Sequence, residues 1–224
     1  GGYDFAKNQV NRVRSLRQTG SLMKPIVYSK AYAMGLPPST LFSGAPFRDG
    51  KYNPTGDKAS DDMIAWNALT ESNNAVSLRM LQYVLKRSPL SEYQAWGTAL
   101  GLGRQLMGYT SEVLGTDQTL WDMTQAFSRL SRRGAKQEFS LIRLVKDGQG
   151  NVLERNLHPL DASNSIRDTL DAIEDWSHKT EPVVIDPLAA YITAANLQEV
   201  TRRGTGKAAG KKLSFPTAGK TGTL

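Results

Sequence analysis

Two side chains near the start of the chain have the chemistry of a serine nucleophile and its base. Ser21 is followed three positions later by Lys24. On a helix, residues three apart share a face, with Cβ atoms roughly 5–6 Å apart, so Lys24 can approach the Ser21 hydroxyl. A lysine can accept the serine proton when burial or a neighbouring cation lowers its pKa. A helix N-terminus at Ser21 would also favour the anion that forms there.

A second pair of polar residues, Ser72 and Asn74, lies in an interruption between two stretches of helical periodicity. An extended backbone at this interruption would point the hydroxyl and the amide into one cleft. The alternative is a helix cap, because Ser and Asn favour such positions. Taken alone, this pair is more often structural than catalytic, and the same is true of Ser21 and Lys24.

The third group comes at the end of the sequence and consists of Lys220, Thr221, Gly222 and Thr223. A strand with these residues presents a cation, hydroxyls and an open backbone edge to an extended peptide. The glycine allows such a peptide to lie close against the strand. The alternative reading is a solvated edge strand.

Mainly helical segments must position these groups. Ser21 suits the start of a helix that ends at Gly35, and Pro25 is tolerated because it falls within the first turn. The spacing of apolar residues predicts further helices over 61–68, 74–86, 91–100, 119–132 and from Asp186 to before Gly204.

The remaining segments supply turns and strands. A β-hairpin is predicted where 139–145 and 151–154 flank the turn at 147–150. Prolines and glycines make 36–56 a loop, the acidic stretch 161–181 is interpreted as a surface insertion, and 213–223 as the approach to a strand. We therefore predict a single mainly helical α+β domain over residues 1–224.

Composition excludes several other chemistries. The 224 residues are enough for a sizeable core, and the absence of cysteine excludes disulfides, thiolate metal sites and cysteine nucleophiles. Two histidines, His158 and His178, are too few for a three-histidine metal site and leave few candidates for a Ser/His/Asp triad. No apolar run approaches the ~18–20 residues of a membrane span, and no signal peptide opens the sequence.

The formal net charge of +7 would attract nucleic acid, anionic lipid or another anionic polymer, and charge alone does not choose among them. The basic residues form two groups, near 12–17 and 202–212, rather than one run. No zinc finger or aromatic RNA-binding signature accompanies them, so we predict no nucleic-acid partner.

The three groups occur in the order Ser-x-x-Lys, Ser-x-Asn, Lys-Thr-Gly, which resembles that of penicillin-binding proteins and serine β-lactamases. Their flanks are similar to the transpeptidase domain of class A (bifunctional) penicillin-binding proteins, although Thr19 stands where that family usually has proline. The similarity covers nearly the whole chain, with 155–182 the least similar part. The flanks that carry it are Gly1-Gly2-Tyr3-Asp4-Phe5, Arg17-Gln18-Thr19-Gly20-Ser21, Gly115-Thr116, Thr119-Leu120-Trp121-Asp122-Met123, Asp186-Pro187, Arg203-Gly204-Thr205-Gly206 and Ala218-Gly219-Lys220.

This resemblance implies a five-stranded antiparallel sheet packed against a helical cluster, with the active site between them. It implies acyl transfer from a D-Ala-D-Ala stem peptide to an amine on a neighbouring peptidoglycan strand, acylation by β-lactam antibiotics, and no metal or organic cofactor. Such enzymes work on the periplasmic side of the bacterial cytoplasmic membrane, where an N-terminal anchor holds them. We expect a partial domain here, because that anchor, a glycosyltransferase domain and two sheet strands on each side would lie outside residues 1–224.

Carried onto this sequence, the resemblance makes Ser21 the nucleophile and Lys24 its proton acceptor. Ser72 would relay a proton to the leaving amine, and Asn74 would hold the substrate amide. Lys220 would be a nearby cation that lowers the pKa of Lys24, with Ser72 between them.

The substrate-binding strand would consist of Lys220, Thr221, Gly222 and Thr223, whose cation and hydroxyls bind the terminal carboxylate of the substrate or of a β-lactam. The backbone N–H groups of Ser21 and Thr223 would form the oxyanion hole.

Three alternatives share these residues. A DD-carboxypeptidase differs only in using water instead of the acceptor amine. A serine β-lactamase of class A also needs a glutamate that activates water, and none of Glu112, Glu154, Glu174 and Glu181 lies in a recognisable motif for that task. A non-catalytic cell-wall or β-lactam-binding module is the alternative from another functional class.

Overall fold

The structure, a computed structural model, describes residues 4, 6–7, 9–50, 52, 54, 59–136, 142, 144–155, 166, 170 and 182–222. The chain divides into two units, residues 1–135 with 183–224 and residues 136–182, and each is described here by itself. Within the described part of the chain, none of the helices combines the length and the apolar composition needed to cross a bilayer.

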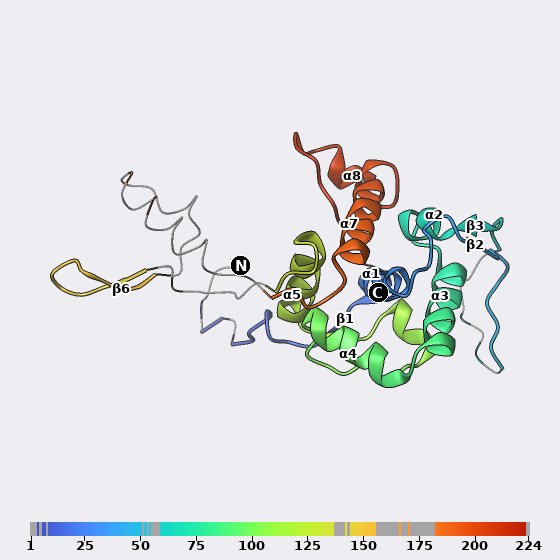
Figure 1. The fold of residues 1–224 in the computed structure, drawn as a ribbon, viewed down its shortest axis with the longest axis horizontal. Coiled ribbons are helices and arrows are strands. Elements are labelled where there is room, and N and C mark those ends of the chain that lie inside the picture. Colours follow the sequence, from blue (N-terminus) through green and yellow to red (C-terminus); the bar gives the residue numbers. More distant parts are fainter. Residues whose placement is uncertain are drawn as a thin grey trace. The chain divides into compact units, whose positions relative to one another are not determined.

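The larger unit is a helical cluster built around α1 (Figure 1). Helix α1 follows directly on a 3₁₀ turn, η1, and nine of its residues, Lys24 to Tyr32, are buried. A helix that is buried on all sides needs small or apolar residues around its whole circumference, and α1 meets this condition except at a few polar positions. It packs against α3 and α7 on two sides and contacts α4 as well. The elements of this unit are β1 (Arg17–Gln18), η1 (Gly20–Met23), α1 (Lys24–Ala33), β2 (Leu41–Phe42), β3 (Met63–Ile64), α2 (Ala65–Thr70), α3 (Asn74–Arg87), α4 (Leu90–Leu100), η2 (Thr110–Leu114), β4 (Asp117–Gln118), α5 (Leu120–Ser131), α7 (Pro187–Arg202) and α8 (Lys207–Gly210).

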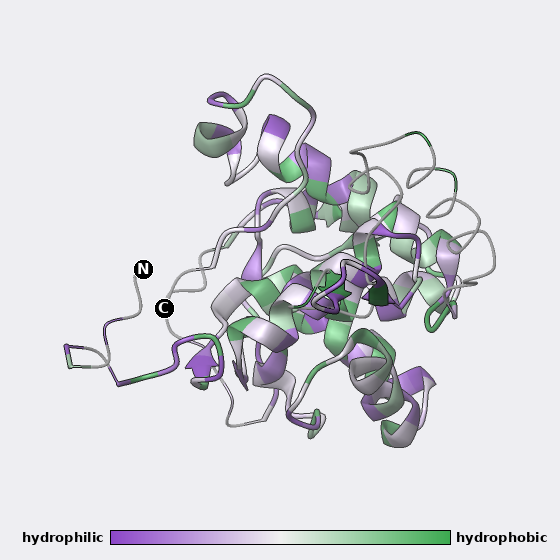
Figure 2. Cartoon of the chain, turned by 90° about the vertical axis from the view of Figure 1, so that its left-hand side faces the viewer, coloured by the Kyte–Doolittle hydropathy of each residue, from purple (hydrophilic) through white to green (hydrophobic). Residues whose placement is uncertain are grey.

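Four predicted helices are confirmed, and side-chain caps fix three of their starts. Asn73 accepts a hydrogen bond from the backbone of Val76 at the start of α3, and Asp186 caps α7 in the same way. Helix α5 begins with a capping box in which Thr119 and Asp122 satisfy each other's backbone N–H groups. Figure 2 shows hydrophobic and hydrophilic residues interspersed along the helical ribbons of the chain, as expected of helices with one buried face.

The helix predicted from residue 61 begins later, so that prediction was wrong in its start. Met63 and Ile64 instead pair with Phe42 and Leu41 as the two-stranded antiparallel ladder β2–β3. The backbone of Ala65 then donates to the carbonyl of Thr40, which satisfies an N–H group at the beginning of α2. The predicted loop 36–56 therefore contains one short strand, whose partner lies about twenty residues away.

The segment before Lys220 also differs from expectation. Within the described residues, 213–222 pair with no strand and run instead along α7. The backbone of Gly219 donates to the carbonyl of Leu197, and the Thr201 hydroxyl donates to the carbonyl of Thr217. Ladders β1–β4 and β2–β3 are the two-stranded antiparallel sheets of the described part of this unit, and the five-stranded sheet that the resemblance implies is not found among these residues.

The smaller unit contains the predicted hairpin. Strands β5 (Leu144–Lys146) and β6 (Val152–Arg155) pair antiparallel around the turn 147–150, and the carboxylate of Asp147 accepts from the backbone of Gln149 and Asn151. Positions 139–141 and 143 of the predicted first strand lie outside the described residues, as does most of the predicted insertion 161–181. Taken with the larger unit, the described residues confirm a helix-rich α+β fold with small antiparallel sheets.

Candidate active site

Ser21 lies in the 3₁₀ turn η1 rather than at the start of an α-helix. Its carbonyl accepts from the backbone of Lys24, the first residue of α1, so the two residues occupy one continuous helical path. Ser21 is half-buried, whereas Lys24 is completely buried. The predicted spacing is therefore present, with the boundary of the α-helix shifted from Ser21 to Lys24.

The turn that carries Ser21 is tied to a distant loop. The hydroxyl of Thr19, which stands at the position of the family's usual proline, donates to the carbonyl of Thr116 at 2.8 Å and accepts from the backbone of Thr116 at 3.1 Å. Gly115 packs against the turn so closely that a Cβ atom there would lie 2.7 Å from the backbone nitrogen of Gly20. Together these contacts tie the turn that carries Ser21 to Gly115 and Thr116.

Lys24 reaches across to the second predicted pair. Its Nζ atom donates to the carbonyl oxygen of Ser72 at 2.5 Å, to the Ser72 hydroxyl at 3.1 Å and to Oδ1 of Asn74 at 2.6 Å. The first two polar groups, about fifty residues apart in the sequence, thus meet in one cluster.

The backbone at Ser72 is left-handed, with a φ of 59°, so the extended conformation that would point Ser72 and Asn74 into one cleft is not present at this residue. Two hydrogen bonds close the end of α2 around it: the Ser72 backbone donates to the carbonyl of Leu69, and Asn73 donates to that of Ala68. This is the Schellman arrangement, in which the left-handed position usually belongs to glycine. A serine there bears a backbone penalty, and its hydroxyl points to where Lys24 lies.

Lys220 completes the cluster from the third predicted group. Its Nζ atom donates to the Ser72 hydroxyl at 2.8 Å, and burial lowers the pKa of Lys220 to about 8. The Ser72 oxygen therefore lies within hydrogen-bonding distance of both Lys24 and Lys220. A hydroxyl with two lone pairs and one proton can exchange protons with either amine.

The rest of the third group passes beside the Ser21 turn. A Cβ atom on Gly222 would lie 3.0 Å from the carbonyl oxygen of Thr19 and 3.1 Å from Cγ of Leu22. This close approach brings the segment next to η1, as an oxyanion hole shared with Ser21 would require. Thr223, predicted as its second donor, lies outside the described residues. Thr221 is exposed, and its hydroxyl lies 2.8 Å from that of Thr205.

Sequence reasoning missed a buried hydrogen-bond network, centred on Asn196, that holds α2 and α7 together. Asn196, which is completely buried, donates to the carbonyl of Trp66 at 3.0 Å and to the Thr70 hydroxyl at 3.0 Å, and it accepts from the hydroxyl of Tyr32 at 3.3 Å. Thr70 comes two residues before Ser72, so this network fixes the backbone that leads into the turn at Ser72. The sequence did contain a signal, because Asn196 is a polar residue on the apolar side of the predicted helix. A buried amide needs several hydrogen-bond partners, so its position indicates such a network.

The carboxylate of Glu112 binds the backbone of a neighbouring loop. Its two carboxylate oxygens accept from the backbones of Met107 and Gly108 at 2.6 and 2.9 Å, and burial raises its pKa. Glu154 lies in the smaller unit on β6, and Glu174 and Glu181 lie outside the described residues.

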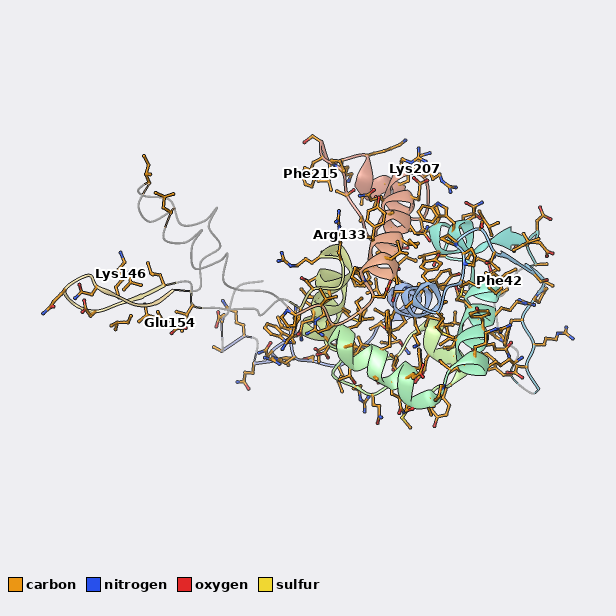
Figure 3. The ribbon with its side chains drawn as sticks, in the orientation of Figure 1. Phe42, Arg133, Lys146, Glu154, Lys207 and Phe215 are labelled. Atoms are coloured by element: carbon orange, nitrogen blue, oxygen red, sulfur yellow. The ribbon has the colours of Figure 1, made fainter. Side chains whose placement is uncertain are left out.

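A cleft of about 350 Å³ lies along the C-terminal half of α7, and none of the predicted site residues lines it. Phe215, labelled in Figure 3, forms part of its wall on the segment after α8. The other residues that line it are Gln198, Glu199, Thr201, Arg202, Gly210, Lys211, Pro216 and Thr217.

Comparisons with known proteins identify the family of the chain. Residues 3–224 match the family model for the penicillin binding protein transpeptidase domain. All of the chain aligns with penicillin-binding protein 1A of Neisseria meningitidis at 31% identity and with that of Rickettsia conorii at 29%, and it spans 27% and 29% of their lengths. The chain thus spans little more than a quarter of these relatives.

The fold has solved counterparts. The crystal structure of penicillin-binding protein 1A from Haemophilus influenzae superimposes with a TM-score of 0.79 at 20% identity, over 98% of this chain and 36% of that one. The PonA1 protein of Mycobacterium tuberculosis in complex with penicillin V gives a TM-score of 0.73 at 18% identity, over 97% and 55%. Since the family match extends across nearly all of the sequence, the chain belongs to the transpeptidase-domain family of penicillin-binding proteins.

Proposed function

We propose that the protein is a peptidoglycan DD-transpeptidase that cross-links stem peptides through a serine acyl-enzyme and that β-lactams acylate. The observation that carries this proposal is the Ser72 hydroxyl held between two amines, 3.1 Å from Lys24 and 2.8 Å from Lys220. The names of the relatives support it, since they are penicillin-binding proteins and one solved neighbour is a complex with penicillin V.

In the first step, the Ser21 oxygen attacks the carbonyl carbon of the penultimate D-Ala, and its proton passes to Lys24. In this step Lys24 acts as a neutral amine. The carbonyl of Ser72 and Oδ1 of Asn74 accept its two N–H groups, its donation to the Ser72 hydroxyl is given up, and its lone pair takes the Ser21 proton. Lys24 is completely buried, and Lys220 donates to the same Ser72 hydroxyl that Lys24 contacts.

In the second step, the C–N bond to the terminal D-Ala breaks and its nitrogen takes a proton. Ser72 supplies that proton and recovers one from Lys24, because its oxygen lies 3.1 Å from Lys24 and 2.8 Å from Lys220, a residue of the proposed substrate-binding segment. The acceptor amine then attacks the ester carbon, returns its proton along the same path, and frees Ser21.

Substrate binding uses the groups that the lysines leave available. Because Oδ1 of Asn74 accepts from Lys24, its Nδ2 group remains to donate to a substrate carbonyl. Lys220 and Thr221 hold the terminal carboxylate, and backbone N–H groups of Ser21 and Thr223 stabilise the tetrahedral oxygen. The proposal needs no metal ion or organic cofactor, and it assigns the protein to the periplasmic side of the bacterial cell envelope.

Intact mass spectrometry with benzylpenicillin tests the proposal. A purified protein that contains these 224 residues should gain one drug mass, and a peptide map should place the adduct on Ser21. Ser21→Ala should abolish the adduct, whereas Ser131→Ala, which removes an exposed hydroxyl on α5, should leave it intact. An adduct on another residue would contradict the assignment.

The adduct measurement, combined with an assay that supplies a donor peptide and an acceptor amine, separates the alternatives. A stable adduct together with cross-linked product from a donor peptide and an acceptor amine indicates the transpeptidase. Hydrolysed donor in place of cross-linked product indicates a DD-carboxypeptidase, and an adduct that is rapidly lost indicates a β-lactamase. No adduct at all indicates a non-catalytic binding module.

A further inference from the structure

The loop between α7 and α8 places a second threonine on the substrate-binding segment. The hydroxyl oxygens of Thr205 and Thr221 lie 2.8 Å apart, which is a hydrogen bond between two groups that can each donate or accept. Thr221 is one of the proposed carboxylate-binding residues, whereas neither the sequence pattern nor the proposed mechanism gives Thr205 a task. The direction of this hydrogen bond decides what Thr221 can offer to a ligand.

The position of Thr205 is fixed by contacts other than its hydroxyl. Its backbone donates to the carbonyl of Thr70 at 3.4 Å, and Gly204 packs so tightly on the same carbonyl that a side chain there would clash. Arg203 donates to Glu199 at 2.6 Å and to Oδ1 of Asn67 at 2.7 Å, which fastens the loop to both α7 and α2. The loop therefore presents the Thr205 hydroxyl to Thr221 from a fixed support.

The groups around Thr221 determine the useful direction. Lys220 can only donate, and its Nζ atom lies 3.5 Å from the Thr221 hydroxyl oxygen. If Thr205 donates as well, both lone pairs of the Thr221 oxygen are occupied, and its own proton points away from both donors. That proton is then available to a carboxylate. If Thr221 donated to Thr205 instead, it would present only lone pairs, which repel a carboxylate.

We propose that Thr205 is a positioning residue that orients the Thr221 hydroxyl as a hydrogen-bond donor to the carboxylate of the ligand. Thr205 thereby contributes to the selection of donors and β-lactams with a free carboxylate over their neutral analogues. This inference rests on the proposed function, because it concerns the same ligand site. It also links that site to the end of α2 through the carbonyl of Thr70, two residues before Ser72.

The test compares benzylpenicillin with its methyl ester as acylating agents. Hydrogen bonds to charged groups are stronger than those between neutral groups, so the second-order acylation rate for the free acid should fall about tenfold in Thr205→Val. The rate for the ester should change little, so the ratio of the two rates measures carboxylate selection. Thr205→Ser keeps the hydroxyl and should restore the parent ratio.

Two further variants make the result specific. Thr221→Val should lower the ratio to the same extent, and the double variant should lower it no further, because both substitutions remove one interaction. Thr124→Val, which removes an exposed hydroxyl on α5, should keep the parent ratio. Should Thr205→Val fold poorly, as judged by its thermal melt, Thr205→Ala serves in its place with the same expected ratio.

The outcomes distinguish this inference from the proposed function. A parent protein that forms no adduct on Ser21 contradicts the proposed function itself. A parent that is acylated, with a free-acid-to-ester ratio unchanged in Thr205→Val and Thr205→Ala, overturns the role of Thr205 alone. Losses that simply multiply in the double variant would also overturn it, because Thr205 would then act independently of Thr221.

Discussion

Lys24 and Lys220 share one hydrogen-bond acceptor, since their Nζ atoms lie 3.1 and 2.8 Å from the hydroxyl oxygen of Ser72. One lysine belongs to the central helix and the other to the segment along α7. Burial lowers the pKa of Lys220 to about 8, so one of these two amines loses its proton more readily than an ordinary lysine. The Ser72 hydroxyl therefore lies where the proposed mechanism requires it, in contact with both amines.

Substitution of Lys24 by arginine should separate a proton acceptor from a fixed charge. Arginine keeps the positive charge but does not lose its proton in proteins, so we expect acylation by benzylpenicillin to slow by ~10²–10⁴ in Lys24→Arg. Rapid-quench labelling measures this rate. Lys30→Arg, at the other end of the same helix, is the matched control and should acylate at the parent rate. A Lys24→Arg variant as fast as the parent would show that Lys24 acts only as a charge.

The pH dependence of acylation should follow Lys220. Burial lowers the pKa of Lys220 to about 8, so the cation that attracts the ligand carboxylate is lost above that pH. We expect the second-order rate with benzylpenicillin to fall above pH ~8, by about tenfold per pH unit at its steepest. In Lys220→Arg the positive charge persists, so this alkaline fall should disappear. An identical fall in both proteins would assign it to another group.

The same titration has a consequence for stability, with a definite sign. The folded-state pKa of about 8 lies below the ordinary lysine value of 10.5, so in this interval the folded protein binds fewer protons at Lys220 than the unfolded chain does. The contribution of Lys220 to the free energy of unfolding therefore rises with pH from about 8 to 10.5. The free energy of unfolding of the parent, measured in urea, should therefore rise relative to that of Lys220→Met as the pH rises across this interval. A constant difference between the two proteins would contradict the lowered pKa of Lys220.

Replacement of Ser72 by glycine should separate its chemistry from its backbone strain. Both Ser72→Gly and Ser72→Ala lose the relay hydroxyl and should acylate at least ~10²-fold more slowly. Only glycine adopts the φ of 59° without penalty, so the glycine variant should be more stable than the alanine variant by about 1 kcal/mol.

Arg133 provides the matched control for that comparison. It is the other described non-glycine residue with a left-handed backbone, at a φ of 54°. Arg133→Gly should therefore gain stability over Arg133→Ala by a similar amount in urea unfolding, with acylation unchanged in both. Equal stability of Ser72→Gly and Ser72→Ala would show that the turn at Ser72 is not strained.

The sequence was sufficient to predict the long helices, and it named Lys24, Ser72 and Lys220, which the structure brings into contact. Helices α3 and α5 have clear apolar periodicity and local caps at Asn73 and Thr119, so local information determines them. The contact between Lys24 and Ser72 was expected from the family resemblance and not from their spacing, because no local rule brings residues 48 positions apart together.

The features that sequence reasoning missed are set by contacts between distant segments. Strands β2 and β3 are two residues long, and their pairing depends on where the loop between them returns. The left-handed turn at Ser72 escaped prediction because glycine or asparagine normally signals such a position. Asn196 escaped it because a buried amide is identified by its partners, Tyr32 and Thr70, which come from two other helices.

The tie between Thr19 and Thr116 has a consequence for the order in which the protein folds. The hydrogen bonds that build the site join residues 48, 97 and 148 positions apart, and closing such long loops costs entropy before any contact compensates for it. Helices with their own caps can form early, whereas the surroundings of Ser21 exist only after segments from the beginning, middle and end of the sequence have come together. The formation of a covalent penicillin adduct would thus show that these distant segments have come together and that folding of the site is complete.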